Sequence, residues 1–240
     1  MELYVEPFSG LSGDMFLGAL AELADGYDDL FSLPQALNLP EAEIHVTPVS
    51  KCGIAAKHVK IIDNEKRSLH RHLSDILEII EKGSISDTSK LIAKEIFSIL
   101  AEAESRVHNI PMERIHFHEL SAVDSIMDIV GNALLIDKLG ISKTYSTSVC
   151  SGFGFVNTQH GKLPVPAPAT MNILEGIPIY RGEEQGERVT PTGAAILKYL
   201  NPVFDIPTIR VMKTVYGAGE KDFKEPNVLR VSEIIPVDGQ

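Results

Sequence analysis

The chain has 240 residues, of which 44% are hydrophobic and 23% are charged, so it is long enough to bury the core of one large domain or of two small ones. A formal net charge of -11 at pH 7 argues against a nucleic-acid partner, because proteins that bind nucleic acids carry a basic surface. A negative field raises the local concentration of cations, so this charge is compatible with metal binding.

The two cysteines, Cys52 and Cys150, do not form a C-x-x-C pair or a disulfide framework, which favours a reducing compartment. Met1 is followed directly by Glu2, without the basic and apolar regions of a signal peptide. No apolar run approaches the roughly 20 residues that a membrane-spanning helix needs. We therefore expect a cytoplasmic protein with no membrane partner.

The first predicted unit is a strand, a turn of small residues and a helix that begins near Met15. Such a turn aims backbone N–H groups at an anion, which makes Ser12 and Gly13 candidate contacts for a phosphate group. The turn matches neither a P-loop nor G-x-G-x-x-G, and a tight turn capped by Ser12 or Asp14 is the simpler alternative. Asp14 suits the role of a helix cap and that of a metal ligand equally well.

A loop and a short helix are predicted between residues 25 and 40. Alternating apolar residues then predict two strands, Glu43 to Val49 and His58 to Ile62, joined as a hairpin through Cys52-Gly53. For His58, as for other histidines on strands, packing in the core or at the surface is the expected role.

A histidine pair precedes the next helix, which is predicted to begin at Leu73 and to end at Gly83. His70 and His72 stand just before its N-terminus. The positive end of the helix dipole disfavours imidazolium, so it keeps a histidine neutral and able to bind a metal. The pair is a candidate metal site, and a solvated basic loop is the alternative.

The strongest metal-binding pattern follows a longer helix that Ser86 is expected to cap. His116 and His118 alternate in an extended segment, which places both imidazoles on one face. Asp124 and Asp128 lie one turn apart on the helix that comes next, which Gly140 is expected to end. Imidazole binds borderline metals and carboxylate binds harder ones, so this set suits nickel, zinc or manganese. The alternative is a helix with a solvated acidic face.

The second half of the chain is predicted to be richer in strands. It begins with a strand from Tyr145 to Cys150 and continues into a glycine-rich hairpin and a proline-rich segment. Thr190 is expected to open a helix, which makes Thr192 and Gly193 candidate phosphate contacts, with plain helix capping as the alternative. A β-turn-β unit between Ile209 and Ile235 closes the sequence.

These elements together predict an α/β (α+β) protein in which helices pack on mixed sheets. No flexible linker interrupts the chain, and the weakest point for a boundary lies between residues 140 and 144. We therefore expect a single domain over residues 1–240, with a helix-rich lobe at 1–140 and a strand-rich lobe at 144–240.

Six sequence blocks, in one order and nearly end to end, resemble the LarC family of nickel insertion proteins. The blocks are Phe8–Met15, His116–Glu119, Ala122–Gly131, His160-Gly161 with Pro164–Thr170, Thr190–Ala195 and Tyr216–Gly219.

The resemblance implies nickel insertion into pyridinium-3,5-bisthiocarboxylic acid mononucleotide during nickel-pincer cofactor biosynthesis. The expected enzyme class is a lyase-type nickel chelatase or cyclometallase that uses CTP and makes two nickel–sulfur bonds and one nickel–carbon bond. Soft sulfur atoms on the substrate would take nickel from a harder nitrogen and oxygen site on the protein.

Two departures from the family pattern limit this expectation. The sequence stops at Gln240, before the further C-terminal domain that the family associates with the nucleotide. CTP with Mg or Mn is therefore expected only together with that domain or its separately encoded chain. The histidine-rich insertion of the family is reduced here to His70-Arg71-His72, which argues against nickel storage in quantity.

The resemblance also implies roles for individual residues. His116 and His118 are expected to bind nickel, with Asp124 and Asp128 as further ligands or as groups that orient them. Glu119 is the candidate base for the ring proton that leaves when nickel bonds to carbon. The expected partners are the mononucleotide precursor and the C-terminal family domain, and the oligomeric state, homo-oligomer included, is left open.

Two other functions stay open at this point. A non-catalytic metallochaperone would pass nickel to a separate partner, and a metal-dependent hydrolase would use the H-x-H pair with distant aspartates. The hydrolase is the weaker of the two, because the sequence lacks a second set of His and Asp residues at strand ends in the order such enzymes need.

Overall fold

The computed structural model describes residues 1–64, 71–115, 123–158 and 161–237 of the chain. Four residues with predicted metal or catalytic roles lie outside these ranges, namely His70, His116, His118 and Glu119.

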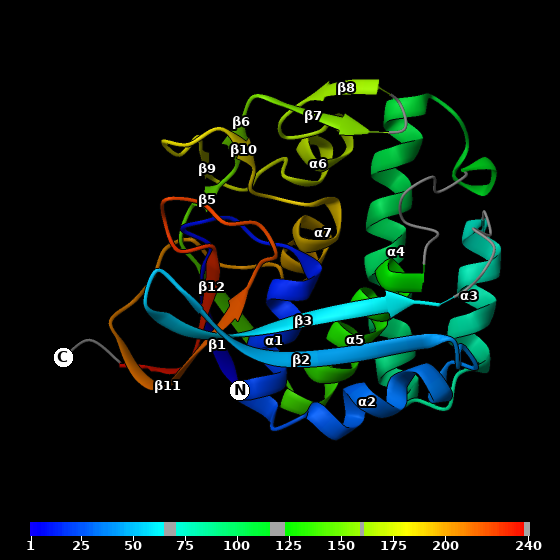
Figure 1. Ribbon diagram of the computed structural model, residues 1–240, viewed down its shortest axis with the longest axis horizontal. Coiled ribbons are helices and arrows are strands. Elements are labelled where there is room, and N and C mark those ends of the chain that lie inside the picture. Colours follow the sequence, from blue (N-terminus) through cyan, green and yellow to red (C-terminus); the bar gives the residue numbers. More distant parts are fainter. Residues whose placement is uncertain (65–70, 116–122, 159–160, 238–240) are drawn as a thin grey trace.

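A six-stranded mixed sheet organises the molecule (Figure 1), with the strand order β2-β3-β11-β12-β1-β4. Its strands are β1 (Glu2–Glu6), β2 (Ala42–Lys51), β3 (Ile54–Asp63), β4 (Lys143–Ser146), β11 (Ile209–Ala218) and β12 (Val228–Pro236). Strand β1 pairs antiparallel with β12 and parallel with β4, so the N-terminal strand lies between two strands from later in the sequence. The predicted α/β class with mixed sheets is confirmed.

Helix α1 (Gly13–Ala24) lies at the centre of the molecule. It is buried along nearly its whole length and contacts β3, β11 and β12 of the sheet as well as helix α5 (Val123–Leu139). A Cβ atom at Gly217 of β11 would fall 1.7 Å from the backbone oxygen of Met15, so only glycine allows the strand to approach α1 this closely. This close approach explains why a glycine, Gly217, occurs inside β11.

The remaining helices lie around α1 and α5, and most of them contact other helices instead of the sheet (Figure 1). They are α2 (Tyr27–Ala36), α3 (Leu73–Lys82), α4 (Asp87–His108), the short 3-10 helix η1 (Met112–Arg114), α6 (Pro168–Ile173) and α7 (Pro191–Leu200). No helix in the described parts of the chain is both long and apolar enough to cross a membrane.

Several predicted boundaries are confirmed. Ser86 accepts a hydrogen bond from the backbone N–H of Ser89 and begins α4, and Gly140, at φ +56°, follows the last residue of α5. Thr190 begins α7 by accepting a hydrogen bond from the backbone N–H of Gly193. The turn between β2 and β3 is formed by Cys52-Gly53, both at positive φ, as in the two-residue hairpins whose twist matches that of the strands.

The single strand predicted from Tyr145 to Cys150 is wrong. The chain forms β4 at the edge of the main sheet and then β5 (Val149–Cys150), which pairs with β9 (Ile179–Tyr180) in a separate two-stranded sheet. The other short strands are β6 (Gly152–Phe153), β7 (Phe155–Thr158), β8 (Gly161–Pro164) and β10 (Gly186–Glu187). The break follows from tertiary pairing, which local alternation of side chains does not reveal.

Candidate functional site

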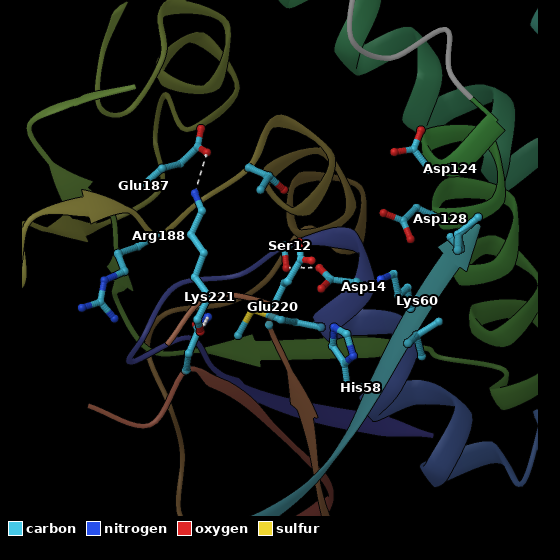
Figure 2. Close-up of a pocket in the computed structure, with 16 residues that line it drawn as sticks. Ser12, Asp14, His58, Lys60, Asp124, Asp128, Glu187, Arg188, Glu220 and Lys221 are labelled. Carbon is cyan, nitrogen blue, oxygen red and sulfur yellow. Dashed lines mark hydrogen bonds and ion pairs between the residues drawn. The ribbon is translucent and has the colours of Figure 1, made fainter. Parts of the chain in front are cut away.

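A pocket of about 440 Å³ lies where the start of α1 and the start of α5 meet β3 and the loop between β11 and β12 (Figure 2). Its walls are formed by Ser12, Asp14, Met15, His58, Val59, Lys60, Ile61, Asp124, Asp128, Glu187, Arg188, Thr190, Gly219, Glu220, Lys221 and Asn227.

Three aspartates form one side of this pocket. Asp124 and Asp128 extend from the first turns of α5, where their spacing places them on one face of the helix, and Asp14 extends from the first turn of α1 (Figure 2). Ser12 donates a hydrogen bond from its hydroxyl group to the Asp14 carboxylate. The two helices therefore bring a residue near the N-terminus together with residues more than a hundred positions later.

The electrostatics of the aspartates disfavour negative charge. Burial raises the pKa of Asp128 well above its usual value, and the neighbouring charges of Asp14 and Asp124 raise it further. Burial also raises the pKa of Asp14, although the hydrogen bond from Ser12 and the nearby His58 partly oppose this shift. The residue Asp124 is exposed, but its carboxyl group is partly desolvated, and this desolvation is the main cause that raises its pKa. The charge of Asp63 raises the pKa of Asp124 further.

Asp128 is also incompletely hydrogen-bonded. Its Oδ1 atom is buried and has no hydrogen-bond partner among the described residues. A buried polar atom without a partner is costly, and the cost is greatest when the group is charged. A bound cation or a proton would relieve both the unsatisfied oxygen and the repulsion from Asp14.

Gly13 makes the burial of Asp128 possible. A Cβ atom at this position would lie 2.5 Å from Oδ2 of Asp128 and 3.0 Å from Cγ2 of Thr192. The side-chain amide of Asn132 joins the two helices, because its Nδ2 donates to the backbone oxygens of Gly13 at 3.0 Å and Asp128 at 2.8 Å. The small residue at the start of α1 thus lets the backbone of α1 approach α5 closely.

The four predicted phosphate contacts lie close together, but they differ in access to the pocket. Ser12 is part of the pocket wall, whereas Gly13, Thr192 and Gly193 are not. Thr192 is only 6% exposed, and the backbone N–H of Gly193 is engaged by the Thr190 cap. A phosphate role for these residues stays a prediction.

His72 lies away from this pocket, at the N-terminus of α3, where its backbone N–H donates to Asp75 Oδ2 at 2.8 Å. In the part of the chain that the structure describes, no three His, Cys, Asp or Glu side chains are arranged to hold a metal ion. Of the predicted metal ligands that the structure describes, Asp124 and Asp128 line the pocket and His72 does not.

Sequence reasoning missed several residues of the pocket wall, among them His58, Lys60 and Lys221. The first two occupy alternate positions on β3 and so point to the same face, a signal that was present in the strand pattern. Lys221 lies in the loop after β11, where no local pattern distinguishes it from an ordinary surface lysine.

Comparison with known proteins gives consistent results over nearly the whole chain. The family model described as nickel insertion protein matches residues 3–238. A "Putative nickel insertion protein" of Dictyoglomus thermophilum is 45% identical over 230 residues, which cover 95% of this chain and 59% of the relative.

Two further relatives carry a more specific name, "Pyridinium-3,5-bisthiocarboxylic acid mononucleotide nickel insertion protein". The protein of Staphylococcus epidermidis is 40% identical over 230 residues, covering 95% of this chain and 58% of the relative. The protein of a Thermotoga species is 42% identical over 243 residues, covering 95% of this chain and 60% of the relative. The chain thus spans about 60% of the length of these curated relatives. No solved structure matches it significantly.

Proposed function

The chain belongs to the nickel insertion protein family, and from this membership we propose that it handles nickel for insertion into pyridinium-3,5-bisthiocarboxylic acid mononucleotide. The observation that carries the proposal is the buried Asp128 carboxylate, which has an unsatisfied oxygen and faces Asp14 and Asp124 in the pocket. A volume of about 440 Å³ lies in the range of small-molecule sites, so the pocket has room for a metal ion and an organic substrate.

Nickel is a substrate in this proposal, and the aspartates are its temporary ligands. Carboxylate oxygens are hard donors, whereas the two thiocarboxylate sulfurs of the mononucleotide are soft donors that bind nickel more tightly. This difference drives transfer from protein to substrate. His116 and His118, which shortly precede Asp124 in the sequence, are proposed as imidazole ligands, and His70 and His72 as residues on the path of nickel uptake.

The proposed reaction class is that of a lyase-type cyclometallase. When nickel bonds to the ring carbon, that carbon gives up a proton, and Glu119 is the proposed acceptor. CTP, with Mg or Mn, is proposed to act through the part of the relatives that lies outside the matched region.

A metallochaperone without catalysis is the second candidate. The aspartate-rich pocket favours it, because ligands of this kind bind nickel and release it readily to softer donors. The two functions differ in product: the cyclometallase yields a nickel–carbon bond in the mononucleotide, and the chaperone yields only transferred nickel. Incubation with the mononucleotide, nickel and CTP, followed by mass spectrometry of the small molecule, distinguishes them.

The nickel site is tested by Asp128→Asn, which keeps the size of the side chain and removes its charge. We expect nickel affinity, measured by isothermal titration calorimetry, to fall by at least about 10-fold, because replacing a ligand should cost no less than replacing a residue that orients one. The control is Asp137→Asn on the same helix. Asp137 accepts hydrogen bonds from Ser86 and Ser89, so this change affects stability alone. Unchanged nickel affinity in Asp128→Asn would contradict the proposed site.

A further inference from the structure

The three aspartates of the pocket are gathered on one side. Asp14, Asp124 and Asp128 lie there together with Lys60, whereas Lys221 lies at the opposite end, paired with Glu187 (Figure 2). A phosphate group is repelled by the aspartates and attracted by the lysine, whereas thiocarboxylate groups would meet the metal ion that the aspartates are proposed to hold. The pocket therefore favours one orientation of a ligand that carries an anion at one end and metal-binding atoms at the other.

Lys221 forms a long ion pair with Glu187. Its Nζ lies 3.7 Å from Oε2 of Glu187, beyond hydrogen-bonding distance, and the Lys221 side chain is 59% exposed. Figure 2 shows this side chain extended toward Glu187 at one end of the pocket. The Glu187 side chain is 18% exposed, so the pair is only partly open to solvent, but at this separation it contributes little stability and the ammonium group can exchange partners at low cost.

The backbone that carries Lys221 is held in place. Lys51, at the end of β2, donates from Nζ to the backbone oxygens of Glu220 at 3.2 Å and Lys221 at 3.5 Å, and to Asp222 Oδ1 at 2.6 Å. Asn227 Nδ2 adds a hydrogen bond to the backbone oxygen of Lys221 at 2.8 Å. A fixed backbone that carries an exposed ammonium group binds an anion without the entropic cost of ordering the loop.

Arg188, another cation of the pocket wall, is already engaged. Its Nη1 donates to the Ser9 hydroxyl at 2.7 Å, its Nη2 to Glu184 at 3.3 Å, and its guanidinium group stacks on the ring of Phe223 at 3.5 Å. The Arg188 guanidinium group points away from the centre of the pocket in Figure 2. Lys221 is therefore the better placed of the two to receive an anion.

We propose that the Lys221 ammonium group leaves Glu187 and binds the phosphate group of the mononucleotide at the rim of the pocket. This inference rests on the proposed function and specifies how the same site holds its substrate. With the phosphate at Lys221, the ring and its sulfur atoms point toward Asp14 and Asp128, where nickel is held. The lysine thereby sets the direction in which the substrate enters.

The test compares two ligands by isothermal titration calorimetry: pyridinium-3,5-bisthiocarboxylic acid mononucleotide and the same compound after a phosphatase has removed its phosphate. Lys221→Met is expected to weaken binding of the phosphorylated compound about 10-fold, the usual size of one charge-assisted contact. Binding of the dephosphorylated compound is expected to stay the same. Glu187→Gln removes the competing carboxylate, so we expect binding of the phosphorylated compound to tighten about 3-fold.

The matched control is Lys82→Met on α3. The Lys82 side chain is 68% exposed and pairs with Glu78, but it does not line this pocket. We expect this variant to bind both compounds as the wild-type chain does.

Three results overturn the inference. If Lys221→Met weakens the binding of both compounds equally, the lysine does not contact the phosphate. If the wild-type chain binds both compounds with the same affinity, no residue of the chain holds the phosphate. The proposed function is not contradicted by that result. If the wild-type chain binds neither compound, the proposed function falls and the inference falls with it.

Discussion

At the scale of one residue, Asp128 is a carboxyl group whose burial lowers the stability of the fold. Its burial and the neighbouring charges of Asp14 and Asp124 disfavour the ionised form, and its Oδ1 lacks a partner among the described residues. A residue kept for folding alone would be better satisfied. Strongly perturbed carboxyl groups in a pocket are typical of functional sites, where a ligand or a proton compensates for the cost.

The first prediction at this scale concerns stability in the absence of metal. The folded-state pKa of Asp128 lies above its unfolded value of about 3.9, so the folded chain binds more protons than the unfolded chain. Asp128 therefore lowers the free energy of unfolding least below about pH 4, where it is protonated in both states. As the pH rises from there through the folded-state pKa, the free energy of unfolding falls. Asp128→Asn removes this dependence, since the amide does not titrate.

We expect the Asn variant to be more stable than the wild-type chain at pH 8, by about 1.4 kcal/mol for each unit of pKa shift, and the difference to shrink toward pH 4. Urea unfolding in EDTA, followed by circular dichroism at several pH values, measures it. A variant less stable than the wild-type chain at pH 8 would show that the carboxylate makes a stabilising contact.

Residue-level prediction from sequence succeeded where the pattern was local. The spacing of Asp124 and Asp128 was enough to place both on one helical face, and both line the pocket. The alternation of His58 and Lys60 on β3 shows that they share a face, but it does not show what that face contacts. Lys221 was missed because it lies in the loop after β11, where no local pattern distinguishes it.

At the scale of elements, helix caps and turns were the features that the sequence predicted best. Ser86, Thr190 and Gly140 mark helix ends because their side chains or backbone angles satisfy the terminal N–H and C=O groups locally. The ends of β4 and β11 were not readable, because they depend on which strand or helix packs alongside. Gly217 is an instance: its lack of a side chain serves contact with α1 and not a turn.

The prediction at this scale concerns the connection between the β2–β3 hairpin and the loop after β11. Lys51→Met removes the donor that binds two backbone oxygens and Asp222, so the loop should open more often. We expect amide hydrogen exchange in residues 219–223 to be about 10-fold faster, which corresponds to about 1.4 kcal/mol, within the range for a lost charged hydrogen bond. Hydrogen exchange with mass spectrometry measures this rate.

Lys213→Met is the control for this experiment. Lys213 also donates from Nζ to two backbone oxygens, those of Glu22 and Leu23, but at a different place in the molecule. Its replacement should leave exchange in residues 219–223 unchanged. Equal exchange in the Lys51 variant and the wild-type chain would show that Asn227 and the strands alone hold the loop.

At the scale of the whole molecule, the sheet combines both halves of the sequence. Strands β1, β2 and β3 come from residues before the weakest predicted boundary, β4 begins within it, and β11 and β12 come from residues after it. Helix α1 packs on strands from both groups. Strand pairing between distant segments carries no local signature, which is why composition suggested two lobes without showing how strands are shared.

This shared sheet leads to the last prediction, that the 240 residues unfold as one cooperative unit. Removing either half would expose the pairing edges of β1 and β12 and the apolar surface of α1, so neither residues 1–140 nor residues 141–240 should fold alone. The chain has no tryptophan, so we would follow unfolding by near-ultraviolet circular dichroism of its tyrosines and by far-ultraviolet circular dichroism of its backbone. Coincident transitions in urea are expected from the two signals, and each separate half should lack a cooperative transition. Two separated transitions, or a folded half, would instead support independent lobes.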